Sequence, residues 1–254
     1  MTEYASKGLF GLLTPQANTT AELEVQILCP PGYAALTARL TSDRPTMEDR
    51  LIDYVAQMDD TITRFANAPI KAVGFACTGA SYLVDPDEER RSLDAIAQRR
   101  GIPFVTAAQA ITDALNCLGA RRIGVVSPYG DSLHDAGMVY WTARSFDIGP
   151  IERLAGQEAA FHPIYSLSGN ASRAGLEALE GSDVDAIVIL GTGLATLGTL
   201  LGRQDQRIPV LTPNLALVWG MLEALTGLAP TRASLDPWLD GSIWAHRYRE
   251  RMGG

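Results

Sequence analysis

Short apolar runs alternate with longer segments of helical periodicity along this chain. The runs, typical of buried strands, cover residues 8–13, 35–40, 70–76, 102–106, 122–127, 185–190 and 208–212. Between them, the segment from Thr46 places apolar residues on one helical face, residues 86–100 form a charged helix, and residues 107–118 form an apolar helix that stops at Gly119. Strands that alternate with helices predict parallel sheets with helices on both faces.

The run at residues 70–76 ends in a small polar corner, Cys77-Thr78-Gly79. A cysteine at the end of a buried strand, beside turn amides that point outward, is where a reactive thiol can sit. A small buried hydrophobic residue would satisfy the same pattern. The corner makes Cys77 a candidate catalytic residue and leaves both interpretations open.

The chain also contains an internal duplication. Three signatures recur in the same order, with offsets of 113 residues from Pro15 to Pro128, 114 from Cys77 to Gly191 and 106 from Pro103 to Pro209. This predicts an α/β fold of two similar Rossmann-like halves with parallel sheets, related by pseudo-two-fold symmetry.

The duplication predicts where the domains and the site lie. We expect a first α/β domain over residues 1–112 and 214–254 and a second over residues 113–213. Ligands in such sheets bind beyond the carboxyl ends of the strands, so the active site is expected in the cleft between the halves. Residues 237–252 predict a basic helix that returns to the first half or packs against a second subunit, which leaves a homo-oligomer open.

Composition narrows the function classes. A net charge of −8 argues against nucleic-acid binding, and lysine at only Lys7 and Lys71 weakens a Schiff-base mechanism. No apolar run reaches 18 residues and no signal pattern opens the chain, so we expect a cytoplasmic protein without a membrane partner. The three cysteines and three histidines lack metal-ligand spacing. We therefore expect no metal centre.

Nucleotide and hydrolase motifs are weak. The stretch that begins at Gly191 approximates GxGxxG but has Thr196 at its last position, and no GxSxG is present.

The Cys77-Thr78-Gly79 corner and its duplicate, Gly191-Thr192-Gly193, suggest a binding site for a carboxylate. Each offers a hydroxyl and backbone N–H groups near an expected helix start, which can bind carboxylate oxygens or stabilise an oxyanion. Ordinary strand-to-helix turns use the same residues. Two further loops could supply hydrogen bonds from Asn18 and Tyr129. The predicted substrate-binding set is Asn18, Thr78, Gly79, Tyr129, Gly191, Thr192 and Gly193.

Residues 15–20, Pro-Gln-Ala-Asn-Thr-Thr, together with Cys77-Thr78 and the duplication, resemble the aspartate/glutamate racemase superfamily. The resemblance is strongest to the branch of maleate cis-trans isomerases and arylmalonate decarboxylases. It implies cofactor-independent chemistry next to a carboxylate, with Cys77 at the first cysteine position and Gly191 at the second. In this branch an isomerase cysteine adds to a double bond, whereas a decarboxylase cysteine protonates an enediolate.

The departures from the family leave three hypotheses. With Gly191 in the second position, two-base racemisation loses one base. The isomerase's second-half asparagine would fall near Ala159-Ala160. The first hypothesis is a maleate-isomerase-like enzyme that acts on a small dicarboxylate with Cys77 as nucleophile. The second is an arylmalonate-decarboxylase-like lyase in which Cys77 donates the proton beside a dioxyanion pocket. The decarboxylases carry their cysteine in the second half, so Cys77, in the first half, would protonate the opposite face of the substrate. The third is a non-catalytic protein that binds a mono- or dicarboxylate.

Overall fold

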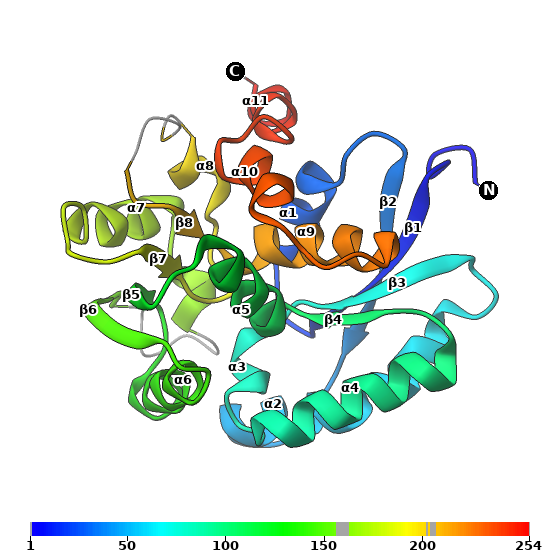
Figure 1. Cartoon of the computed structure of the whole chain (residues 1–254). Helices are drawn as coiled ribbons and strands as arrows, with labels where there is room; N and C mark the ends of the chain where they lie inside the picture. Colours follow the sequence, from blue (N-terminus) through cyan, green and yellow to red (C-terminus); the bar gives the residue numbers. More distant parts are fainter. Residues whose placement is uncertain (1, 156–162, 202, 204–206, 254) are drawn as a thin grey trace.

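Two four-stranded parallel sheets form the frame of the chain (Figure 1). The computed structural model describes residues 2–155, 163–201, 203 and 207–253. The first sheet has the order β2 (Tyr33–Leu40), β1 (Gly8–Pro15), β3 (Ile70–Phe75) and β4 (Phe104–Thr106). The second has the order β6 (Asp147–Arg153), β5 (Arg122–Ser127), β7 (Ala186–Ile189) and β8 (Val210–Leu211). The two orders are equivalent, and the predicted fold class is confirmed.

Helices cover the first sheet on both sides. On one face, α1 (Ala21–Leu28) contacts β1 and β2, and α9 (Pro213–Thr226) contacts β3 and β4. Helices α2 (Met47–Ile62) and α4 (Pro86–Arg100) lie on the opposite face (Figure 1). Helix α5 (Ala107–Leu118) packs along α9. Buried apolar side chains on these helices and strands form the core that holds the site.

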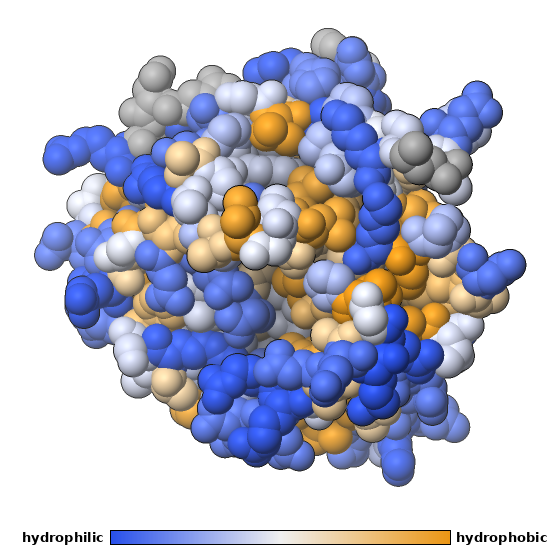
Figure 2. All heavy atoms as spheres, turned by 45° about the vertical axis from the view of Figure 1, so that its right-hand side comes forward, coloured by the Kyte–Doolittle hydropathy of each residue, from blue (hydrophilic) through white to orange (hydrophobic). Residues whose placement is uncertain are grey.

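The second sheet carries α6 (Asp131–Ala143) and α7 (Gly169–Ala178). Short elements complete the described chain: η1 (Thr63–Phe65), α3 (Thr78–Ser81), η2 (Pro163–Ser166), α8 (Leu197–Leu200), α10 (Arg232–Leu239) and α11 (Ala245–Met252). No helix among the described residues is long and apolar enough to cross a membrane. On the face seen in Figure 2, hydrophilic residues predominate and hydrophobic ones form smaller patches between them.

The same backbone hydrogen bond closes the site end of both sheets. The Ala76 amide donates to the Leu13 carbonyl at 2.9 Å, and the Leu190 amide donates to the Val126 carbonyl at 2.9 Å. These pairs are equivalent under the duplication, so the loops that follow β3 and β7 leave corresponding positions. Both loops therefore start at the carboxyl ends of inner strands.

Local sequence explains where the long helices begin and end. Thr46 caps α2 by accepting from the Asp49 amide at 3.1 Å, and Asp85 caps α4 directly before Pro86. Helices α5 and α9 end at Gly119 and Gly227, each with φ of +67°, a left-handed conformation that favours glycine.

The C-terminal segment differs from the expectation of one helix over residues 237–252. It forms α10 and α11, separated at Asp240–Trp244, because Gly241 has φ of +78° and the Asp240 carboxylate accepts from the Ser242 amide at 2.8 Å. The expected return to the first half does occur. Arg247 donates from Nε to the Ile27 carbonyl at 2.6 Å and caps the end of α1.

The division into domains stays a prediction. The expected boundary between residues 112 and 113 falls inside α5. Helix α9 follows β8 of the second sheet but packs on β3 and β4 of the first. At that contact Met221 fills the space beside Gly74, where an added Cβ would lie 2.5 Å from its sulfur.

Candidate active site

A cavity lies where the carboxyl ends of the two sheets meet. The first half lines it with the loop after β1, with helix α2 and with the Cys77 corner, and the second half contributes the loops after β5 and β7 and the turn η2. The lining residues are Pro15, Gln16, Ala17, Met47, Arg50, Leu51, Tyr54, Cys77, Gly79, Tyr129, Leu133, Ile164, Tyr165, Thr192 and Gly193. Elements from both halves therefore enclose one site.

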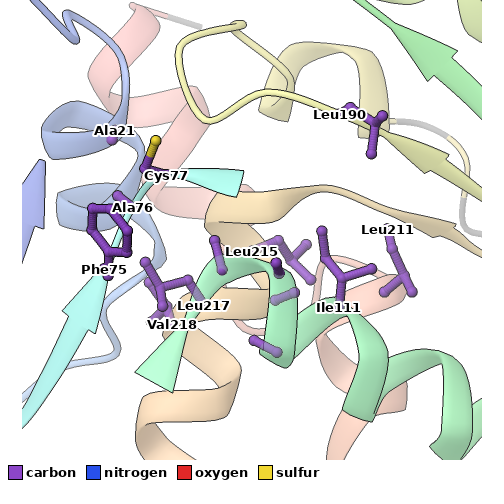
Figure 3. Close-up of a cluster of buried hydrophobic side chains, with 14 of the residues drawn as sticks. Ala21, Phe75, Ala76, Cys77, Ile111, Leu190, Leu211, Leu215, Leu217 and Val218 are labelled. Carbon is purple, nitrogen blue, oxygen red and sulfur yellow. The ribbon is translucent and has the colours of Figure 1, made fainter. Parts of the chain in front are cut away.

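Cys77 follows β3 and precedes the first turn of α3. Figure 3 shows it beyond the buried side chains of Phe75, Leu217 and Val218, with its sulfur pointing away from Leu217 and Val218. The residue is 5% exposed, and burial raises the pKa of its thiol to about 12, while the Gly79 and Ala80 amides oppose that shift. The free protein therefore holds Cys77 as a neutral thiol at neutral pH.

Thr78 and Tyr129 connect the two halves beside this thiol. The Thr78 hydroxyl and the Tyr129 hydroxyl lie 2.7 Å apart, and either oxygen can donate. Burial raises the pKa of Tyr129, so its phenol stays protonated and remains a hydrogen-bond donor. Tyr129 lines the cavity, whereas Thr78 lies behind it.

Asn18 and Thr192 form a second connection between the halves. Asn18 Nδ2 donates to Thr192 Oγ1 at 3.1 Å, and Thr192 Oγ1 donates to the Ala76 carbonyl at 2.8 Å. Asn18 Oδ1 accepts from the Thr20 and Ala21 amides at 3.0 and 2.9 Å, at the start of α1. Asn18 does not line the cavity in this structure. Its predicted contact with substrate stays a prediction, and its observed partner is Thr192.

The buried carboxylate of Glu24 anchors the loop after β7 through hydrogen bonds. Glu24 accepts from the Thr196 and Leu197 amides at 2.7 and 3.1 Å and from Asn214 Nδ2 at 2.8 Å. The same Asn214 nitrogen donates to the Thr192 carbonyl at 3.0 Å. Burial raises the pKa of Glu24, and these hydrogen bonds oppose the shift. The network ties α1 and α9 to the loop after β7.

The two duplicated corners have different conformations. Cys77 is extended, with φ of −153°, and α3 starts at the next residue. Gly191 has φ of +91°, and α8 starts only at Leu197, so the expected helix start beside Gly191 is not present. A Cβ built on Gly191 would lie 2.4 Å from Ile164 Cδ1 and 2.9 Å from Pro128 Cγ. The backbone at this position suits glycine, and neighbouring side chains occupy the space of a second thiol.

The structure brings five of the eight predicted site residues to the cavity wall: Cys77, Gly79, Tyr129, Thr192 and Gly193. Asn18, Thr78 and Gly191 lie directly behind them. Sequence reasoning missed the α2 residues Arg50, Leu51 and Tyr54. The helical periodicity of Leu51 and Tyr54 indicated only a core face, and no pattern marked Arg50. It also missed Gln16, although this residue lies in the 15–20 motif, and Tyr165, which no motif distinguishes.

Neither a metal centre nor a second reactive cysteine is indicated among the described residues. No cluster of three His, Cys, Asp or Glu residues able to hold a metal occurs among the residues described above. Burial raises the pKa of Cys29 to about 12, and Cys117 is half-buried on α5. Ala159 and Ala160, near which the isomerase asparagine was expected, lie outside the described residues.

Comparisons with known proteins agree with the geometry. The sequence model of the family described as arylmalonate decarboxylase matches residues 10–234. Maleate isomerase from Pseudomonas putida KT2440 is 26% identical over 231 residues, which cover 85% of this chain and 90% of the relative. Maleate isomerase from Nocardia farcinica is 27% identical over 226 residues, with 85% and 89% covered.

Solved structures share the fold. Maleate isomerase from Pseudomonas putida S16 superposes with a TM-score of 0.76 at 22% identity, covering 86% of this chain and 93% of that one. A liganded arylmalonate decarboxylase in which one glycine is replaced by cysteine and one cysteine by serine gives a TM-score of 0.73 at 19% identity, with 92% and 100% covered.

Proposed function

Because the chain belongs to the arylmalonate decarboxylase family, we propose that it is a cofactor-independent enzyme that isomerises a small dicarboxylate of the maleate type, with Cys77 as nucleophile. One observation carries this proposal: Cys77 is the cysteine that lines the cavity between the halves, in a chain whose curated relatives are named maleate isomerases. The Nocardia farcinica maleate isomerase has also been solved, as a cysteine-to-serine mutant, with a covalently bound succinylcysteine intermediate.

The proposed reaction needs no redox step. After the Cys77 thiol has lost its proton to solvent, the thiolate adds to one alkene carbon, and the π-electron pair moves onto the neighbouring carbon and its carboxylate. The former double bond is then a single bond and can rotate. Return of the electron pair re-forms the double bond and expels the thiolate. Rotation between these two steps converts the cis isomer into the trans isomer.

Donors at the cavity wall would stabilise the charge that develops on the carboxylate. Tyr129 offers a protonated phenol, and the Gly79 amide lies at the first turn of α3. Such fixed donors stabilise an enediolate most strongly when water is excluded. Gly79 suits this close approach, because a Cβ there would lie 3.1 Å from Leu133 and 3.3 Å from Leu51.

A second candidate function is decarboxylation of a disubstituted malonate. The thiol pKa of about 12 favours it, because a neutral thiol is already a proton donor, whereas the nucleophile must first lose its proton. Loss of carbon dioxide would leave an enediolate, and the Cys77 S–H proton would pass to its carbon. The resulting thiolate would then take a proton from solvent.

One pair of incubations separates these functions. The protein is mixed with maleate and with phenylmalonate while fumarate and carbon dioxide are measured, and Cys77→Ala is the matched control. Fumarate formation that is lost in Cys77→Ala supports the isomerase, and carbon dioxide release with the same loss supports the lyase. Thermal stabilisation by either acid without turnover would indicate a binding protein instead.

A cytoplasmic location and a homo-oligomeric state belong to the same proposal. Cell fractionation tests the first and light scattering of the purified protein tests the second.

A further inference from the structure

The loop after β1 brings the backbone amide of Ala17 to the cavity that contains Cys77. We propose that the Ala17 N–H binds the second carboxylate of the substrate, and that Arg39 is the positioning residue that fixes this loop. The inference rests on the proposed isomerase function, in which Gly79 and Tyr129 bind the first carboxylate. It deepens that function by naming where the other carboxylate binds.

The register of the first sheet places this loop beside the thiol. Leu13 of β1 pairs with Phe75 of β3, and each chain continues for two residues, to Pro15 and to Cys77. Neighbouring strands lie about 4.8 Å apart. A carboxylate on the carbon next to the one that Cys77 attacks can therefore reach the loop that starts at Pro15.

One guanidinium group holds the carbonyls of this loop. Arg39, on β2, donates from Nη1 to three main-chain oxygens, those of Pro15, Gln16 and Asn18, at 3.4, 3.2 and 3.0 Å. Its Nη2 pairs with the Glu22 carboxylate. The Asn18 amide closes the turn by donating to the Pro15 carbonyl at 3.1 Å. The carbonyls therefore face Arg39, which is not among the residues that line the cavity.

These contacts decide where the amides of the loop point. The peptide bond between Gln16 and Ala17 is trans, so its N–H lies opposite the carbonyl that Arg39 holds. The preceding peptide has the same orientation. Burial raises the pKa of Tyr54 at the cavity wall, and the Gln16 N–H opposes that shift through a hydrogen bond to the phenol. The Ala17 N–H has no acceptor among the residues that the structure describes, and it is directed at the space that substrate would fill.

The charge of Arg39 supports the same subsite. Burial raises the pKa of Tyr165 at the cavity wall, and the positive charge of Arg39 opposes that shift, so its potential extends into the cavity. The Asn18 side chain instead joins Thr192 to the start of α1. A fixed N–H with an arginine behind its peptide is an arrangement that binds anions.

The first test follows the Ala17 amide of the full chain by nuclear magnetic resonance. The dipeptide Gln-Ala occurs at 16–17 and 109–110, so glutamine labelled at its carbonyl carbon and alanine labelled at nitrogen together select two amide signals. Ala110 is a buried residue of α5 and gives the internal control. The variant Ala17→Ser keeps the backbone N–H and identifies the Ala17 signal by removing it.

Succinate and succinamate are the two probes. Succinate, which has no double bond to isomerise, should shift the Ala17 proton downfield and leave the Ala110 proton in place. Succinamate has one carboxylate replaced by an uncharged amide. It should bind about tenfold more weakly, the loss expected for one hydrogen bond to a charged group.

A second test measures the positioning role of Arg39 by calorimetry. Arg39→Met releases the three carbonyls, so the affinity for succinate should fall about tenfold or more and that for succinamate by less than about threefold. Arg39→Lys keeps the charge without the planar fork and should recover only part of the loss. Arg122→Met is the matched control. Arg122 pairs with Asp147 and donates to a main-chain carbonyl at the amino end of β5, so its loss should change neither affinity.

Each other result has a defined meaning. An Ala17 signal that succinate does not move would overturn the subsite, while fumarate formation from maleate would still support the isomerase. A shifted Ala17 signal in a protein that forms no fumarate would keep the subsite and overturn the reaction. Equal losses of succinate and succinamate affinity in Arg39→Met would overturn the positioning role. Far-ultraviolet circular dichroism checks the fold of that variant, and Arg39→Lys carries the same comparison if Arg39→Met is unfolded.

Discussion

The hydroxyls of Thr78 and Tyr129 lie 2.7 Å apart, one directly after the candidate nucleophile and the other on the opposite half of the molecule. Both side chains are buried, so neither hydroxyl can exchange this partner for water at low cost. The pair therefore sets the separation of the two loops as well as the position of a donor at the cavity wall.

Removal of this hydrogen bond should weaken both folding and turnover. Tyr129→Phe leaves the Thr78 hydroxyl without its partner, at a cost of about 1–2 kcal/mol in the free energy of unfolding. Urea unfolding of Tyr129→Phe, Thr78→Val and the double variant measures the coupling. If the two single effects simply add, the two hydroxyls do not stabilise each other.

Gly191→Cys should not create a two-thiol enzyme. The positive φ and the contact with Ile164 both oppose a side chain, so we expect about 2–4 kcal/mol of destabilisation from backbone strain and overpacking together. Gly101→Ala is the control for φ alone, since Gly101 has φ of +67° with nothing within 4 Å of an added Cβ. A Gly191→Ala variant no less stable than Gly101→Ala would contradict the steric explanation.

Glu24→Gln should loosen the loop after β7. A glutamine oxygen can accept from the Thr196 and Leu197 amides, but its NH2 group would face the NH2 group of Asn214. Reversing the Asn214 amide would sacrifice its bond to the Thr192 carbonyl. We expect a loss of about 1–2 kcal/mol at neutral pH, comparable with one or two buried hydrogen bonds. Glu177→Gln, at an exposed position of α7, is the control.

The Glu24 carboxyl should make the stability of the folded protein depend on pH. Burial raises the native pKa of Glu24 above its usual value of 4.5, so the native protein binds this proton more readily than the unfolded chain does. The resulting stabilisation is complete below pH 4.5 and is lost as pH rises through the native pKa. Denaturant titrations should therefore show a larger gap between the parent and Glu24→Gln in acid than at neutral pH. A gap that widens with rising pH would refute this.

Cys77 should react slowly with alkylating agents at neutral pH. Because its pKa is raised to about 12, the thiolate fraction should increase about tenfold per pH unit without a plateau below pH 10. Peptide mass spectrometry after iodoacetamide treatment follows Cys77 separately from Cys29 and Cys117. A rate that reaches half its maximum near pH 9.0, the unshifted value of a cysteine, would show that the thiol has an ordinary pKa in solution.

The sequence predicts most of the frame because its signals are local. Periodicity and capping residues place α4 at Pro86–Arg100 and α5 at Ala107–Leu118, in agreement with the expected ranges. The duplication pairs Cys77 with Gly191, and both do follow inner strands. These features depend on neighbouring residues or on repeated spacing, which a single sequence contains.

The missed features depend on contacts between distant segments. Tyr165 reaches the cavity because η2 fills space in front of Gly193, and no local pattern encodes that packing. Asn18 contacts Thr192, which is 174 residues away, and so lies behind the wall. The late start of α8 follows from the loop that Glu24 holds, another contact between the halves.

The position of α9 has a consequence for synthesis of the chain. Every strand of the second sheet has been made once Leu211 is complete, but the first sheet still lacks the helix that covers β3 and β4. Domains emerging from the ribosome usually fold from the N-terminus onwards. Here the later half can close its core before the earlier one. Until Leu217 and Met221 have emerged, the strand that leads to Cys77 stays uncovered on that side.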